Sequence, residues 1–173
     1  MGGEIVEKVV AFLDEIGIAT AFAAVAGKSV LPGIAVHDGV IAIDRERLAF
    51  PGDLLHEAGH LAVMAPRTRD GSSGRLNAVK AEEIAAIAWS YAASVHLGID
   101  AAVVFHDGGY RGGGASLRDN FTQGYYIGVP VLQWLGMTAD AERAAELGVA
   151  PYPAMLRWTN EHARELRAPD AEG

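Results

Sequence analysis

The strongest constraint on this chain is a five-residue motif, HExxH, at residues 56–60. In an α-helix, side chains four positions apart lie on one face, so the motif places the imidazoles of His56 and His60 beside each other. Neutral imidazole is a preferred ligand of zinc, and two imidazoles can bind one ion. The motif therefore predicts a helix that presents two ligands to a zinc ion.

The residue between the histidines indicates what chemistry such a metal would support. Glu57 lies one position round the helix from His56, where its carboxylate is badly placed to bind the same ion but can reach a water bound to it. A metal lowers the pKa of that water, and a carboxylate can take the proton that the water loses. Two ligands and one base within five residues are typical of metal-assisted hydrolysis. We therefore predict Glu57 as a general base.

The residues around the motif predict a helix packed inside a domain. Leucine, alanine and methionine recur between residues 54 and 64, Asp53 is expected to cap the helix, and Pro66 is expected to end it. Residues 67–75 are predicted to form a polar loop. Gly59 costs a helix about 1 kcal/mol relative to alanine. Such a small residue is expected where another element must approach the metal-binding face closely.

A catalytic zinc site needs a third protein ligand and one position left open for water. The next predicted helix, residues 78–97, is alanine-rich and contains Glu82 and Glu83 near its start. A carboxylate in a buried helix needs a partner, and a metal ion is one. Glu83 shares its helix face with small residues that would allow a close approach, so we predict Glu83 as the third ligand and Glu82 as the substitute. Both acids could instead serve only the dipole of the first helical turn.

The remaining pattern predicts an α+β domain that is mostly helical. A β-hairpin is expected over residues 32–44, turning at Asp38 and Gly39. Its second strand, residues 40–43, is expected to offer an edge along which an extended peptide can lie. Residues 18–26 fit a strand or a helix equally. Further helices are predicted over residues 4–15, 117–135, 139–147 and 153–166, the third of them capped by Thr138.

A glycine-rich segment, residues 105–114, carries the other candidates for catalysis. Five glycines surround Tyr110 and Arg111 and predict a loop of the kind that closes over an active site. Hydrolysis at zinc creates an oxyanion, which Tyr, His or Arg side chains can stabilise. We predict Tyr110 for this role, with His106 and Arg111 as alternatives. The competing interpretation is a surface loop whose glycines only turn the chain.

Composition limits the classes of protein that fit. The chain has 173 residues, half of them hydrophobic, which predicts one globular domain over residues 1–173. The lack of cysteine excludes disulfides, thiolate zinc fingers and cysteine nucleophiles, and it fits a reducing cytoplasm. A net charge of −8 argues against nucleic acid and anionic membranes as partners. We expect a cytoplasmic protein without a membrane span, and the sequence does not predict its oligomeric state.

The order of these parts resembles the zincin metallopeptidases, which place a helix and a short β-hairpin before an HExxH helix and a following helix with a glutamate. Within them the chain is most similar to the Glu-zincins of the ImmA/IrrE type. Those proteins typically carry Glu-x-x-Ala-x-x-aromatic-small on the second helix, and residues 83–90 fit this pattern. The resemblance covers residues 4–97. Just before the motif the family often has Arg-Phe-Thr, where residues 49–53 read Ala-Phe-Pro-Gly-Asp.

The resemblance implies a zincin-like fold in which a small sheet packs on the HExxH helix. It implies zinc bound by His56, His60 and Glu83, with Glu57 as the base and a peptide or protein as the substrate. The alternative is a non-catalytic zinc-binding or regulatory interaction domain with the same fold. A structural zinc site would need a fourth protein ligand, for which His96 and His106 are the obvious nitrogen donors.

Overall fold

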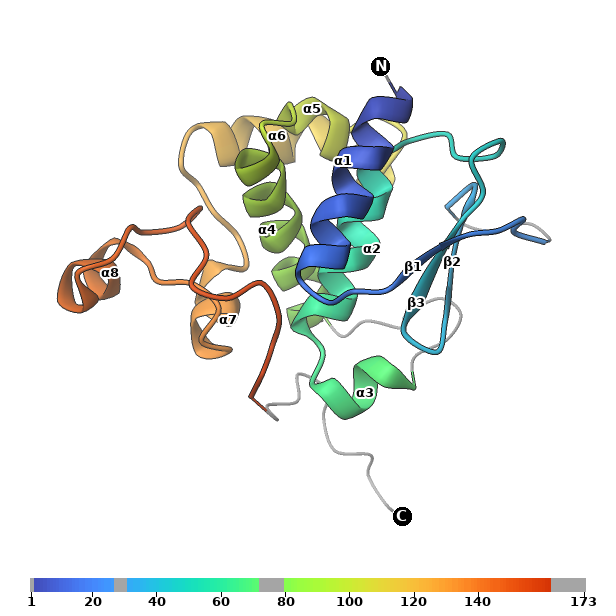
Figure 1. Cartoon of the computed structure of the whole chain (residues 1–173). Coiled ribbons are helices and arrows are strands. Elements are labelled where there is room, and N and C mark those ends of the chain that lie inside the picture. The colour runs from blue at the N-terminus through green and yellow to red at the C-terminus, as the bar shows by residue number, and fades with distance from the viewer. Residues whose placement is uncertain (1, 27–30, 72–79, 163–173) are drawn as a thin grey trace, which may run out of the picture.

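The structure is a computed structural model that describes residues 2–26, 31–71 and 80–162. Within these residues the chain forms the predicted α+β fold, with helices gathered beside a small sheet (Figure 1). The α-helices are α1 (Gly2–Glu15), α2 (Gly52–Val63), α3 (Pro66–Asp70), α4 (Lys80–Leu97), α5 (Ala101–Val104), α6 (Gly114–Thr122), α7 (Val129–Trp134) and α8 (Ala141–Leu147). The strands are β1 (Thr20–Phe22), β2 (Ile34–His37) and β3 (Val40–Ile43), and Tyr110–Gly112 forms a 3-10 turn, η1.

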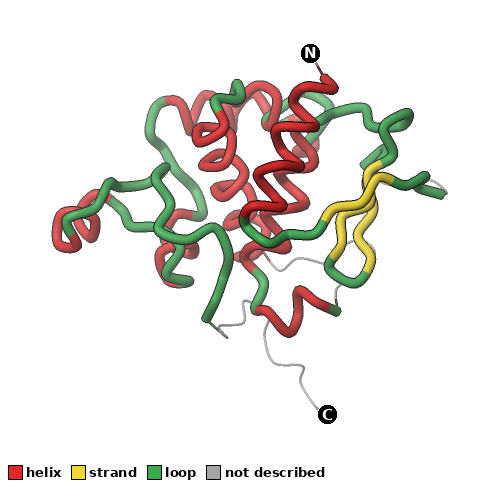
Figure 2. Tube along the Cα trace, in the orientation of Figure 1, coloured by secondary structure: helices red, strands yellow, loops and turns green. Residues whose placement is uncertain are grey.

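The sheet stands at one side of the helices (Figure 2) and has the order β1-β3-β2. Strands β2 and β3 pair in antiparallel fashion and confirm the predicted hairpin, with Asp38 and Gly39 at its turn in positive φ. Strand β1 pairs with β3 in parallel, so the ambiguous segment 18–26 contains a strand. Strand β3 is therefore central. The prediction that it offers a free edge is wrong, because a strand of three residues carries too little pattern to reveal the pairing of β1.

Helices α2 and α4 pack against each other at the centre of the fold. Gly59 of α2 approaches α4 so closely that a Cβ atom there would lie 2.9 Å from the carbonyl oxygen of Ala86. The close approach expected at Gly59 is thus confirmed. At the start of α2, a Cβ on Gly52 would lie 1.9 Å from the carbonyl oxygen of Val103. Glycine at both positions lets α2 lie against α4 and α5.

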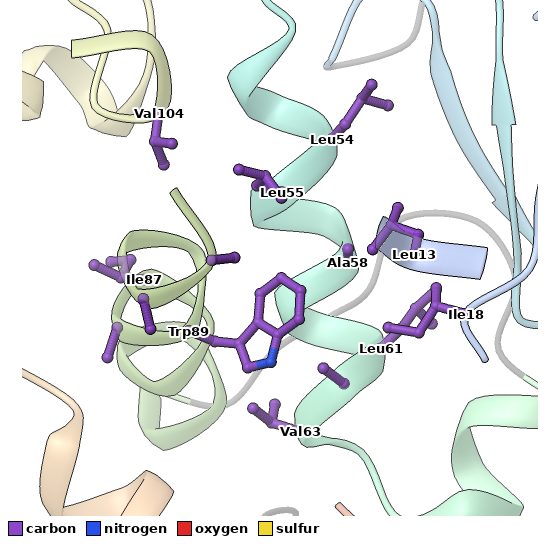
Figure 3. Close-up of a cluster of buried hydrophobic side chains, with 14 of the residues drawn as sticks. Leu13, Ile18, Leu54, Leu55, Ala58, Leu61, Val63, Ile87, Trp89 and Val104 are labelled. Atoms are coloured by element: carbon purple, nitrogen blue, oxygen red, sulfur yellow. The ribbon is translucent and has the colours of Figure 1, made fainter. Parts of the chain in front are cut away.

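The hydrophobic core surrounds α2. Figure 3 shows Leu55 and Leu61 of α2 in the same cluster as Trp89 of α4, and Leu13 of α1 lies beside them. These side chains are fully buried, and burying one such side chain stabilises a fold by about 1.5–3 kcal/mol. The indole nitrogen of Trp89 donates a hydrogen bond to the carbonyl of Trp158, 2.9 Å away. The helix that carries the motif is therefore held on several sides by apolar contacts.

The two ends of α2 differ from the prediction. Asp53 lies inside the helix and does not cap it, because its carboxylate accepts a hydrogen bond from His106 instead. The helix ends at Val63, and Pro66 begins α3. Residues 67–70 of the predicted polar loop are therefore helical, and residues 72–75 lie outside the described part of the chain.

Helix α3 closes the end of α2. The guanidinium of Arg69 donates hydrogen bonds to the carbonyls of Leu61 and Met64, at 2.8 and 3.0 Å. The last carbonyls of a helix have no partner within it, so these bonds satisfy acceptors that would otherwise be lost. Arg69 also donates to the carbonyl of Asn160, which ties the later part of the chain to the same place.

Two predictions for the later part of the chain are wrong. The single helix expected over residues 117–135 is divided into α6 and α7 by residues 123–128. Gly128 in this break lies so close to α4 that a Cβ would lie 1.9 Å from the carbonyl oxygen of Ile84. The helix expected over residues 153–166 is absent from its described part, residues 153–162. Backbone bonds to other elements replace it, as in Asn160, whose N–H donates to the carbonyl of Ala62.

The cap expected at Thr138 is also misplaced. Helix α8 begins after Asp140, whose carboxylate accepts a hydrogen bond from the N–H of Arg143 at 2.9 Å. The Thr138 hydroxyl donates to the carbonyl of Ala154 instead. Among the described helices, none is both long enough and apolar enough to cross a membrane.

Candidate metal centre

Helices α2 and α4 bring His56, His60 and Glu83 together. The Nε2 atoms of His56 and His60 are 3.2 Å apart. The carboxylate oxygens of Glu83 lie 3.4 Å from Nε2 of His56 and 3.3 Å from Nε2 of His60. A tetrahedral zinc ion with ligands at about 2.0–2.1 Å separates neighbouring ligand atoms by about 3.3 Å. The predicted juxtaposition is confirmed, and its spacing suits zinc; that zinc is bound stays a prediction.

The group is buried on one side and open on the other. The side chains of His60 and His56 are 5% and 13% exposed, whereas that of Glu83 is 44% exposed. His60 faces the interior because it lies one turn after His56, towards the close approach of α2 and α4. Glu83 lies in the first turn of α4, which is less buried than the turns that follow it. An ion held here would have its exposed side beside Glu83.

Glu82, the substitute ligand, lies on the other side of His60. Its Oε1 is 3.2 Å from Nδ1 of His60, and the residue is only 2% exposed. Successive residues of a helix point about 100° apart, so Glu82 and Glu83 cannot occupy the same place. They contact the two different nitrogens of one imidazole. Glu83 is therefore the glutamate that belongs to the group of three.

The carboxylates make this a place that attracts positive charge. Burial lowers the pKa of His60, but its hydrogen bonds to Glu82 and Glu83 more than reverse this and raise the pKa to about 9. The bonds that Glu83 accepts from His56 and His60 hold its own pKa well below the usual range. The metal-free group thus holds a proton that a cation can replace.

Glu57 lies on α2 beside the two histidines and is partly buried. Burial raises the pKa of its carboxyl, while the charges of His60 and His56 act in the opposite direction. A carboxylate with a raised pKa is a stronger base, and a general base works best when its pKa approaches the working pH. The environment of Glu57 therefore fits the predicted role.

The loop after α5 places Tyr110 against the centre. The ring of Tyr110 meets the ring of His56 edge-on, with centroids 5.3 Å apart. Its hydroxyl is buried and forms no well-aligned hydrogen bond within the described residues, although the Ser90 hydroxyl lies near it. Burial, followed by the negative charge of Asp53, raises the pKa of Tyr110. The hydroxyl therefore keeps its proton and can donate a hydrogen bond to a ligand.

His106 does not join the metal group. Its Nε2 donates to Oδ1 of Asp53 at 2.8 Å, and its ring stacks on that of Phe50 with centroids 3.9 Å apart. A Cβ on Gly109 would lie 3.0 Å from Cε1 of His106, so the turn before Tyr110 rests on this ring. His106 therefore joins the loop to the first turn of α2. The sequence offered no signal for this pair, whose members are far apart along the chain.

The other candidates lie elsewhere. The side chain of Arg111 is exposed, and His96 lies near the end of α4, with its ring 5.5 Å from that of Phe12 and 5.1 Å from that of Trp158. Within the described residues, the group that could hold a metal consists of His56, His60 and Glu83, without a fourth member. Of the segments that are not described, 27–30 and 72–79 contain no His, Cys, Asp or Glu, whereas 163–173 contains Glu165, Asp170 and Glu172.

Comparisons of the chain with protein-family profiles, curated proteins and solved structures found no match. The resemblance to the zincins therefore stays a prediction.

Proposed function

We propose that this protein is a zinc-dependent hydrolase, specifically a metallopeptidase, with zinc bound by His56, His60 and Glu83. The observation that carries the proposal is the spacing of these three groups, 3.2–3.4 Å between donor atoms, with one side exposed. Structural zinc sites have four protein ligands, whereas catalytic sites have three and an open position. The absence of a fourth ligand within the described residues favours the catalytic arrangement over the non-catalytic alternative.

Zinc bound here would lower the pKa of a water and polarise a carbonyl oxygen. Glu57 follows His56 directly on α2, and we propose that its carboxylate reaches a water bound at the open position. In the proposed reaction Glu57 takes the proton of the attacking water and then passes it to the leaving amine. Burial supports this role, because it raises the pKa of Glu57 and strengthens it as a base.

Tyr110 is proposed to stabilise the oxyanion. Its ring lies against His56, and its hydroxyl has no well-aligned partner among the described residues, so it is available to donate a hydrogen bond to a substrate. Two finer points rest on the sequence alone. A peptide or protein substrate is proposed from the resemblance to the ImmA/IrrE type, and a cytoplasmic location is proposed because a chain without cysteine fits a reducing compartment.

The direct test replaces Glu57 by glutamine. We expect Glu57→Gln to bind zinc as the wild type does, since Glu57 is not a ligand, and to lose cleavage of a mixed peptide library scored by mass spectrometry. Glu142→Gln, an exposed substitution on α8, is the matched control and should cleave normally. Full cleavage by zinc-loaded Glu57→Gln would exclude Glu57 as the base. A zinc-loaded wild type that cleaves nothing would support the non-catalytic alternative.

A further inference from the structure

We propose that Glu82 is a positioning residue of the zinc site, which accepts a hydrogen bond from Nδ1–H of His60 and thereby directs Nε2 of His60 towards the metal. This inference rests on the proposed zinc site and deepens it. Glu82 would not touch the ion; it would act through His60 alone. The observation behind it is the 3.2 Å contact between Oε1 of Glu82 and Nδ1 of His60, on the ring edge opposite Glu83.

The burial of Glu82 fits a role beside a metal-binding histidine. A carboxylate at 2% exposure has lost its water, which is unfavourable unless charged or polar partners replace it. The dipole of the first turn of α4 would favour an acid there, but an exposed acid would serve the dipole equally well. A buried acid in contact with a metal-binding imidazole has a more specific explanation, because a cation on Nε2 strengthens Nδ1–H as a donor.

The contact also fixes which nitrogen of His60 is free to bind. A neutral imidazole has one N–H and one lone pair. With an acceptor at Nδ1, the proton stays on that side and the lone pair of Nε2 faces His56 and Glu83. Glu82 thus selects the tautomer that can bind a metal in the centre, and it holds the ring plane in the orientation that the bond requires.

The two histidines differ in this respect. Nδ1 of His56 is buried and has no hydrogen-bond partner among the described residues, whereas Nδ1 of His60 has Glu82. His60 is also the more buried of the two. Glu82 therefore makes His60 the better oriented ligand. This asymmetry gives the experiment an internal control, since a change at Glu82 should alter His60 and leave His56 largely as it was.

The first measurement is zinc affinity by competition with a chromophoric chelator, for wild type, Glu82→Ala, Glu82→Gln and Asp53→Asn. Loss of such an outer partner weakens metal binding by about 10–100-fold, so we expect that loss in Glu82→Ala. Glutamine keeps an acceptor oxygen without the charge and should rescue part of the affinity. Asp53→Asn removes a nearby negative charge that touches no ligand, so it should lose less than Glu82→Ala. Equal losses in Asp53→Asn and Glu82→Ala would reduce the effect to general electrostatics and overturn the proposal.

The second measurement begins with the wild type, whose result does not depend on whether a variant folds. In zinc-loaded, ¹⁵N-labelled wild type, long-range ¹H–¹⁵N spectra should show His60 protonated at Nδ1, with a proton that exchanges slowly. In Glu82→Gln that signal should shift while the His56 ring signals stay in place. Zinc bound at full affinity by Glu82→Ala, or His60 protonated at Nε2, would contradict the role of Glu82. A wild type that binds no zinc would instead remove the proposed function on which the inference depends.

Discussion

The helices α2 and α4 and the glycine-rich loop of residues 105–114 contribute to the same centre in different ways. The helices supply all three proposed ligands from a closely packed interface whose buried residues are mostly apolar. The loop supplies Tyr110, whose ring meets that of His56, and its His106 donates a hydrogen bond to Asp53 of α2 and stacks on Phe50, which precedes α2. The difference indicates a division of labour: the helices should determine whether metal binds, and the loop should determine how fast a bound substrate reacts.

The largest expected effect belongs to the helices. Glu83→Ala removes one of three proposed ligands. Loss of a hydrogen-bond partner of a ligand lowers metal affinity by up to about 100-fold, and we expect zinc affinity to fall by more than this in Glu83→Ala. Zinc content after dialysis, measured by mass spectrometry, checks this. Glu142→Gln is the exposed control and should keep about one equivalent. If Glu83→Ala retains zinc, a residue other than Glu83 is the third ligand.

The loop should give the next largest effect, on rate alone. Tyr110→Phe keeps the ring that packs against His56 and removes only the hydroxyl. Loss of one oxyanion donor costs about 10²–10³-fold in kcat, and zinc affinity should be unchanged. Steady-state kinetics on a cleaved peptide together with zinc titration would separate the two quantities. A large loss of zinc in Tyr110→Phe would break the division between helices and loop.

A third test varies pH. The pKa of His60 in the metal-free protein is raised to about 9, so below that pH a proton must leave before zinc can bind. Zinc affinity should therefore rise with pH up to about 9, by about tenfold per unit where one proton competes. Chelator competition between pH 6 and 9 measures the slope. If zinc affinity does not change with pH, zinc does not displace a proton from His60.

The smallest effect compares two glycines. Gly59→Ala would place a Cβ 2.9 Å from the carbonyl of Ala86, and overpacking of this kind lowers the free energy of unfolding by about 1–3 kcal/mol. Gly109→Ala would press on the His106 ring instead and should alter turnover more than stability. Urea unfolding and peptide cleavage on both variants give the comparison. Equal stability losses at the two positions would show that the loop is as tightly built as the helices.

The part of the centre that the sequence predicted is the part set by local spacing. His56 and His60 share a face because they are four apart on a helix, and Glu57 lies one position round the helix from His56. The small neighbours on its helix face, together with the resemblance, favour Glu83 over Glu82 as the ligand. The structure shows why the choice matters: both glutamates contact His60, on opposite nitrogens. A pattern in one helix cannot tell which of two adjacent acids will face another helix.

What the sequence could not predict depends on contacts between distant segments. The sequence predicts strand β3 as an edge because β1 is only three residues long and carries little pattern. In the structure β1 pairs with β3 on the side away from β2. Residues 153–162 have a helical pattern but bond to the backbone of α2 and of the segment before α8. Asp53 looked like a cap, and its partner, His106, is far away in the sequence. In each case a tertiary hydrogen bond outweighed a local preference.

The most direct test of the central claim is the coordination of zinc in the loaded protein, by anomalous X-ray diffraction supported by X-ray absorption. The account predicts one zinc bound by Nε2 of His56, Nε2 of His60 and a carboxylate oxygen of Glu83, with a solvent oxygen in the remaining position. A zinc ion with a fourth protein ligand in place of the solvent oxygen, or a zinc ion bound away from these residues, would contradict the account.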